Sequence, residues 1–244
     1  MRRKKTLHPL VRIFLSFLFV AALVSGYLLY QWYQRSGERT TRLWDWLRNP
    51  GENTAWMMVA GERCNDAPFA FPTDGFIGFL WDDSFRPGHR HQGIDIFGGQ
   101  EPGITPVYAA YSGYLTRLPE WKSSLIIRIP GDPLKPSHQI WNYYTHLADR
   151  DGLSYIESNF PPGISELWVE AGTLLGYQGN YSGDPNNPTG VHLHFSIVMD
   201  DGDGNFRNEL KIQNTLDPSP YLGLALNANQ NPGEVVLCEK TQDE

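Results

Sequence analysis

The segment from Val191 to Ile197 alternates strictly between apolar and polar residues, the period of a β-strand with one buried face. Its apolar positions are Val191, Leu193, Phe195 and Ile197. His192 and His194 share the other face, about 7 Å apart at the backbone by the rise of a strand. Two imidazoles so placed can bind one metal ion, or act as one ligand and one proton carrier. The alternative is a half-buried strand that carries two surface histidines.

Short strand-like runs separated by Gly and Pro continue through most of the chain, which contains 24 Gly and 18 Pro. The predicted strands are Phe76–Trp81, Ile94–Phe97, Pro106–Ala110, Gly113–Leu118, Leu125–Ile129, Trp141–His146, Thr173–Tyr177 and Val191–Met199. No helical pattern separates these runs, so we expect neighbouring strands to pair antiparallel. The sequence therefore predicts a mostly β fold built on a compact antiparallel sheet.

A second pair of candidate ligands lies in the segment His91-Gln-Gly-Ile-Asp95. The spacing of four would suit a helix, but Gly93 and the isoleucines on either side of Asp95 argue against one. A straight strand would separate the two backbones by about 13 Å, too far for a shared ion. We therefore expect the chain to bend at Gly93, which has the necessary backbone freedom.

Two imidazoles and a carboxylate around an open fourth position form the ligand set of a catalytic zinc ion. Such an ion lowers the pKa of its bound water to about 7 and polarises the carbonyl group under attack. Amide hydrolysis also requires a base, and a proton for the leaving amine. His146 and His192 are available for these tasks, although His146 could instead be a core histidine between tyrosines and a leucine. His89 is a weaker rival to His91 as a ligand, and His138 is predicted to be exposed to solvent.

The residues Ile13–Tyr30 carry no charge, and the run has about the length needed to cross a bilayer core of about 30 Å as a helix. Five basic residues precede this run and aromatic residues follow it. This pattern predicts an amino end in the cytoplasm and a body outside it. We expect a single-pass protein of the cell membrane with an extracytoplasmic catalytic domain. A cleavable signal peptide is the alternative, and it would also export the body.

The chain divides into five predicted segments: a basic cytoplasmic segment (1–12), a transmembrane anchor or uncleaved signal (13–33), a stalk (34–66), a catalytic domain (67–224) and a polar tail (225–244). Cys64 and Cys238 lie on the exported side, near the two ends of the domain. An oxidising compartment would allow them to pair. Two unpaired thiols are the alternative, because the geometry of a disulfide cannot be derived from sequence.

The charge of the chain is unevenly distributed between its ends. Residues 1–33 carry +5, which leaves about −12 for the remainder of a chain whose net charge is −7. Binding to a polyanion requires basic residues at its phosphates. Nucleic acid is therefore not an expected partner.

Several motifs together resemble the lysostaphin-type zinc metallopeptidases, a family of peptidoglycan endopeptidases with the duplicated hybrid motif fold. The resemblance extends from about Thr73 to Leu222. Its motifs are Phe85-Arg-Pro, His91-Gln-Gly-Ile-Asp95-Ile, Thr105-Pro-Val-Tyr-Ala-Ala, Tyr144-Thr-His146-Leu, Val169-Glu-Ala-Gly-Thr-Leu-Leu-Gly176, Gly190-Val-His192-Leu-His194-Phe and Asp217-Pro-Ser-Pro-Tyr221-Leu. Each motif is weak alone, but their order and spacing are specific.

The resemblance implies a barrel-sandwich hybrid of antiparallel strands with a Zn2+ ion in a groove between loops. By position in the motifs, His91, Asp95 and His194 match the zinc ligands of the family, and His146 and His192 match its catalytic histidines. The implied activity is a zinc-dependent metalloendopeptidase that hydrolyses peptide bonds in peptidoglycan cross-links. Two alternatives remain: a noncatalytic or latent cell-wall module of the same fold, and a zinc protease that acts on extracytoplasmic proteins.

Overall fold

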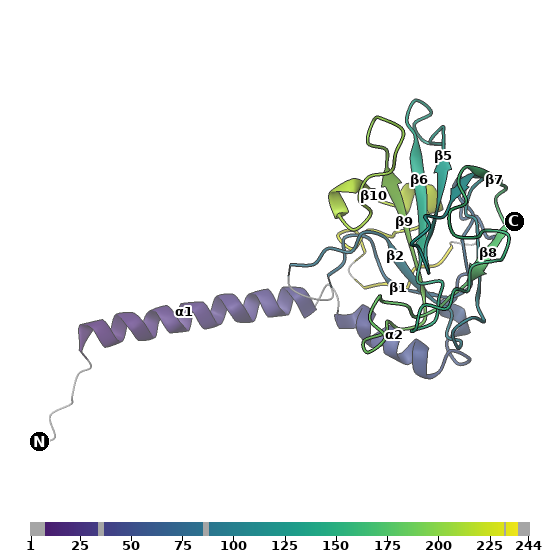
Figure 1. The fold of residues 1–244 in the computed structure, drawn as a ribbon. Coiled ribbons are helices and arrows are strands. Elements are labelled where there is room, and N and C mark those ends of the chain that lie inside the picture. The colour runs from purple at the N-terminus through teal and green to yellow at the C-terminus, as the bar shows by residue number, and fades with distance from the viewer. Residues whose placement is uncertain (1–7, 34–36, 85–87, 232, 239–244) are drawn as a thin grey trace, which may run out of the picture.

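The computed structural model describes residues 8–33, 37–84, 88–231 and 233–238. The first residues of the predicted cytoplasmic segment, the Phe85-Arg-Pro motif and the last six residues of the predicted tail lie outside these ranges. Figure 1 shows one long amino-terminal helix followed by a domain rich in strands.

Helix α1 (Pro9–Trp32) contains the predicted membrane segment. Pro9 stands at its first turn, where no backbone N–H is required. The stretch Pro9–Gln31 is long and apolar enough to cross a membrane, and an amino-terminal signal sequence would meet the same description. None of its most apolar stretch is buried by the rest of the protein. The helix is thus a candidate membrane span on length and composition.

The main sheet has eight strands, and every pair in it is antiparallel. Along the sheet the order is β1 (Phe76–Phe79), β2 (Ile94–Phe97), β9 (Leu193–Met199), β6 (Ile140–Thr145), β5 (Leu125–Ile129), β4 (Gly113–Thr116) and β7 (Leu167–Val169), with β10 (Thr215–Leu216) also beside β9. A second, two-stranded sheet pairs β3 (Pro106–Tyr108) with β8 (Leu174–Tyr177). The predicted antiparallel β fold is confirmed.

The central strand β9 explains why the two faces of the sheet differ. Leu193, Phe195 and Ile197 are completely buried in the main core, as the alternation of the sequence predicts. Tyr144 of β6 lies opposite Phe195 and accepts a hydrogen bond from the backbone N–H of Ala110 (2.9 Å). His194 therefore projects from the opposite face.

Residues 38–66 differ from the predicted stalk, because they pack against the domain. Helix α2 (Glu38–Arg48) buries Arg39, Leu43 and Trp46, and the short 3₁₀ helix η2 (Thr54–Trp56) follows it. The indole N–H of Trp46 donates to the backbone carbonyl of Phe97 (2.8 Å). The segment is polar in composition, but its apolar residues form a helical stripe that needs a partner surface.

The described part of the predicted polar tail is also packed. After the 3₁₀ helix η3 (Ile212–Asn214) and helix α3 (Ser219–Leu222), the chain buries Leu226 and Val236 in the main core. Cys64 and Cys238 form a disulfide with their Cα atoms 5.2 Å apart. The carboxyl end is therefore held beside the residues that follow α2, as far as residue 238.

Candidate metal centre

Asp95 and His194 lie opposite each other on β2 and β9, which are paired antiparallel. Asp95 Oδ1 lies 2.8 Å from His194 Nδ1. Close approach of these strands requires Gly93, since a Cβ atom at that position would lie 2.1 Å from the carbonyl oxygen of Phe195. Gly93 is not among the residues with positive φ. The bend predicted there thus depends on the missing side chain and not on a left-handed backbone.

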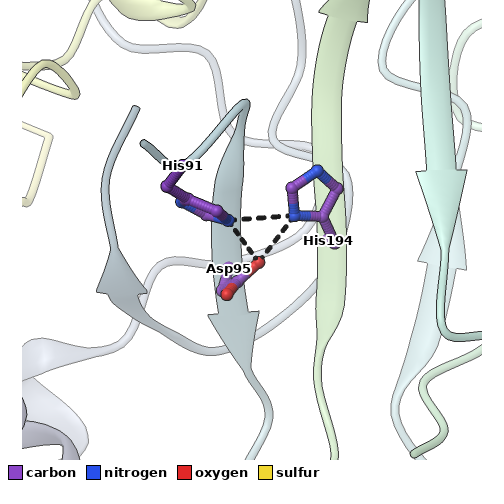
Figure 2. A group of neighbouring side chains, drawn as sticks. All are labelled: His91, Asp95 and His194. Carbon is purple, nitrogen blue, oxygen red and sulfur yellow. Dashed lines mark hydrogen bonds and ion pairs between the residues drawn. The ribbon is translucent and has the colours of Figure 1, made fainter. Parts of the chain in front are cut away.

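His91 reaches the same point from the loop that precedes β2. Its backbone N–H donates to the carbonyl of Asp83 (2.8 Å), and its ring Nδ1 lies 2.9 Å from the carbonyl oxygen of Leu80. A carbonyl can only accept, so Nδ1 carries the proton and Nε2 presents a lone pair. Nε2 lies 3.0 Å from Asp95 Oδ1 and 3.0 Å from His194 Nδ1. Figure 2 draws the contacts among the three side chains as dashed lines.

These three side chains fit a divalent metal ion. Their ligand atoms all lie within 4.8 Å of one another. Tetrahedral zinc with bonds of about 2.1 Å places its ligands about 3.4 Å apart, close to the separations found here. The proton on His91 Nδ1 and its carbonyl acceptor are the outer-shell contact that typically orients a ligand histidine. Two neutral imidazoles and one carboxylate form a borderline-soft donor set that suits zinc.

His192 and His146 lie beside this cluster and are oriented in the same manner. His192 Nδ1 lies 2.7 Å from the carbonyl oxygen of Gly190, and His146 Nδ1 lies 2.6 Å from that of Tyr181. Both rings therefore direct an unprotonated Nε2 away from the backbone. His192 Nε2 lies 3.6 Å from Asp95 Oδ1, and the centroids of the two imidazoles are 4.5 Å apart. His146 adopts the left-handed conformation, with φ +70°.

Burial and charge set the protonation of His192, His146 and Asp95. Burial lowers the pKa of His192 to about 3 and also lowers the pKa of His146, in both cases against the opposing charge of Asp95. Burial works against the charged form of Asp95 as well, but His91 and His192 outweigh it and hold the pKa of that carboxyl well below its usual range. At neutral pH the cluster therefore combines one carboxylate with neutral imidazoles at His146 and His192.

The cluster lies in a groove with a volume of about 570 Å³. On the β1 side of the cluster, Thr40, Leu43, Trp44 and Leu47 of α2 line the groove together with Phe79 and Phe97. The lining also includes Tyr143 and Thr145 of β6, together with Gln92, Glu209 and Leu210.

The structure also shows where the two other histidines considered from the sequence lie. The ring of His89 stacks at 6.4 Å from that of His91 and lines the groove, but His89 is outside the three-residue cluster. His138 is exposed, as the sequence predicts. The contribution of α2 to the groove was missed. Its signal is present at positions 40, 43, 44 and 47, which lie on one face of a helix.

No protein-family model and no curated protein matches the chain. Among solved structures, it is similar to the catalytic domain of the antimicrobial peptidase lysostaphin from Staphylococcus simulans, with a TM-score of 0.38 and 20% identity over 65% of this chain and 94% of that one. A longer lysostaphin chain from the same organism matches with a TM-score of 0.38 and 19% identity, over 68% of this chain and 55% of that one. The catalytic domain of a prophage-encoded M23 protein from Enterococcus faecalis matches with a TM-score of 0.36 and 19% identity, over 62% of this chain and 96% of that one.

These scores and identities are low, so the likeness concerns fold alone. The expected fold is present, with His91, Asp95 and His194 gathered on neighbouring elements of one antiparallel sheet. The β domain therefore has the compact antiparallel sheet that the sequence predicts.

Proposed function

We propose that the protein is a zinc-dependent metalloendopeptidase that hydrolyses peptide bonds in peptidoglycan cross-links, outside the cytoplasm. One observation carries the proposal: a three-ligand cluster lies directly beside two histidines whose Nδ1 atoms are bound to carbonyl groups. A structural zinc site has four protein ligands, whereas a catalytic site keeps one position open. The cluster has three, among the described residues.

In this proposal His91, Asp95 and His194 hold the ion through Nε2, Oδ1 and Nδ1 respectively. When bound, zinc supplies an acidified water and polarises the peptide carbonyl. Asp95 supplies the single negative charge of the ligand set, so the centre keeps a net positive charge. Leu80 fixes the ring of His91 through its carbonyl, which prevents Nδ1 from competing as a ligand.

His192 and His146 supply the proton transfers. Each has its Nδ1 proton committed to a backbone carbonyl, so only Nε2 can accept a proton from the attacking water. The protonated imidazole then returns that proton to the leaving amine. The second ring, whose centroid is 4.5 Å from that of the first, also presents an unprotonated Nε2, so it can accept a second hydrogen bond from the attacking water and orient that water toward the carbonyl. The short distance between the rings makes double protonation unfavourable, so one ring at a time carries the charge.

Peptidoglycan is the proposed substrate because the sequence motifs resemble those of peptidoglycan endopeptidases and because the amino-terminal helix predicts export. The test uses the full-length protein loaded with zinc, incubated with purified peptidoglycan, and mass spectrometry of the released fragments. We expect new peptide termini at cross-links. His192→Ala serves as the blank, and His138→Ala, which changes an exposed histidine, should behave as wild type.

Two results would contradict the proposal. Cleavage of added unfolded proteins without release from peptidoglycan would identify a protease of extracytoplasmic proteins. Zinc binding without cleavage of either substrate would identify a noncatalytic or latent module.

A further inference from the structure

Helix α2 forms one side of the groove although it lies outside the segment that carries the motifs. Thr40, Leu43, Trp44 and Leu47 all line the groove. They follow the i, i+3, i+4, i+7 spacing that places residues on one helical face. A neighbouring stripe of the same helix, Arg39, Leu43 and Trp46, is buried against the domain. The buried stripe therefore holds the helix against the domain and the other stripe faces the groove, with Leu43 shared between them.

Buried polar contacts hold α2 in place, so that its groove-lining residues form a fixed wall of the groove. Arg39 Nε bonds Asp83 Oδ2 at 2.9 Å, and both side chains are almost fully buried. Arg39 also donates to the carbonyl of Asn231 (2.5 Å). Asp83 in turn accepts the backbone N–H of His91 through its carbonyl. The wall is thus bonded to the same turn that positions a candidate zinc ligand.

The apolar surface of this wall continues up to the cluster itself. Phe79 meets the ring of His91 edge-on at 6.3 Å, and Phe97 stacks on the ring of His192 at 4.9 Å. Leu43 and Leu47 pack in the same apolar cluster as these two phenylalanines. Trp44 stands at the rim of this surface with 55% of its area exposed. A chain that contacts the candidate metal centre would therefore also meet apolar side chains on the α2 side.

The two sides of the groove differ in polarity. None of the described lining residues that α2, Phe79 and Phe97 contribute is charged. Beyond the cluster the lining contains the hydroxyls of Tyr143 and Thr145 of β6, the carboxylate of Glu209 and the exposed apolar side chain of Leu210. In the order of the sheet, β2 and β9 carry the cluster between β1 on one side and β6 on the other. A peptide lying across the cluster thus meets an uncharged, mainly apolar surface on the α2 side and a mixed surface with one carboxylate beyond the cluster.

We infer that the α2 side of the groove is a subsite for an uncharged, apolar side chain of the peptide substrate, next to the bond that is cleaved, and that Trp44 and Leu47 determine this preference. The inference rests on the proposed peptidase function and adds the substrate residue that the site selects. Burial of an apolar side chain against this surface is favourable, whereas a carboxylate or ammonium group would lose hydration without gaining a partner.

Binding is tested apart from catalysis in the His192→Ala background. The full-length protein is placed in phosphatidylcholine nanodiscs and labelled with 5-fluorotryptophan, and the Trp44 signal is assigned from Trp44→Phe. Blocked tripeptides Ala-X-Ala, with X as Leu, Asp or Lys, are titrated by fluorine NMR. We expect the Leu peptide to shift the Trp44 signal and to bind about tenfold more tightly than the Asp and Lys peptides. The signal of Trp168, 48% exposed on the edge strand β7, should not move.

Catalysis gives the second measurement. Trp44→Ala should reduce the selectivity of kcat/KM for Leu over Asp about tenfold, Trp44→Phe should retain most of it, and Trp168→Ala should leave it unchanged. Equal shifts for all three peptides, or unchanged selectivity in Trp44→Ala, would overturn the subsite while leaving the peptidase intact. A Trp44 signal that responds only to the lipid of the nanodisc would assign this surface to the membrane instead. Leu-selective binding without any cleavage would retain the subsite and reject the peptidase.

Discussion

Asp95 and His194 face each other as cross-strand partners, and Asp95 Oδ1 lies 2.8 Å from His194 Nδ1. A site built on two paired strands is held by the ladder of the sheet and not by loops alone. The position of His91 depends instead on the turn at residues 80–83, through the Leu80 and Asp83 carbonyls. Rigid strands therefore supply two ligands, and a turn supplies the third.

Loss of a proposed ligand should remove the metal, whereas loss of a proposed base should not. We expect Asp95→Ala and His194→Ala to lose both zinc and turnover. His192→Ala should keep most of the zinc and lose turnover by a factor of roughly 10²–10⁴. Elemental analysis after gel filtration, with His138→Ala as the matched control, measures the difference. Retention of zinc by His194→Ala together with its loss from His192→Ala would reverse the assignment.

Gly93→Ala should destabilise the fold by about 2 kcal/mol or more, because its Cβ would lie 2.1 Å from the carbonyl oxygen of Phe195. The strand pair β2–β9 would have to separate at the ligands. Gly51→Ala is the control, since nothing lies within 4 Å of a Cβ at that position. Urea denaturation measures both variants. Equal midpoints would show that the strand pair tolerates the methyl group.

The left-handed backbone of His146 predicts unequal effects of two substitutions. Asn adopts positive φ more readily than other non-glycine residues, whereas β-branched Val strongly disfavours it. We expect His146→Val to be less stable than His146→Asn by about 1–3 kcal/mol, with turnover lost in both. Thermal unfolding measures the difference. The same pair of substitutions at exposed His138 should differ much less, and an equally large difference there would rule out the backbone as the cause.

Removal of the disulfide should loosen α2 as well as the carboxyl end. The double variant Cys64→Ala/Cys238→Ala is expected to lose about 2–5 kcal/mol of stability. Arg39 of α2 donates to Asn231, so amide hydrogens of α2 should exchange faster in this variant. Hydrogen exchange with mass spectrometry measures this. Leu237→Ala, at an exposed neighbour of Cys238, is the control. Unchanged hydrogen exchange in α2 would show that the stability of the helix does not depend on the disulfide-linked tail.

The strands were predictable because their pattern is local. Leu125–Ile129 and Ile94–Phe97 were predicted with the observed bounds, and the run before Met199 begins two residues later than predicted. Strand β7 was missed, since it has three residues and two of them are exposed. A strand so short and open has no pattern of its own and is defined by its partner β4.

The position of α2 against the domain could not be predicted from the local sequence pattern of the helix. Arg39 is buried because Asp83 lies 44 residues away in sequence, and Trp46 is buried because its N–H meets a carbonyl 51 residues away. The carbonyl acceptors of the histidines are a similar case. Leu80, Gly190 and Tyr181 act through backbone atoms, which no residue type encodes. Sequence could thus name the five candidate residues that the structure brings together, but not the backbone atoms that orient them.

The connection between α1 and α2 has a mechanical consequence. Helix α1 ends at Trp32 and α2 begins at Glu38, and a fully extended chain of that length spans about 20 Å at most. If the anchor is retained, α2 stays within this distance of the bilayer surface. The groove that α2 borders is then held near the membrane as well. Encounters with the proposed peptidoglycan substrate would then depend on lateral diffusion in the membrane and on the distance to the nearest glycan strand. The bulk concentration of the protein would not affect their rate.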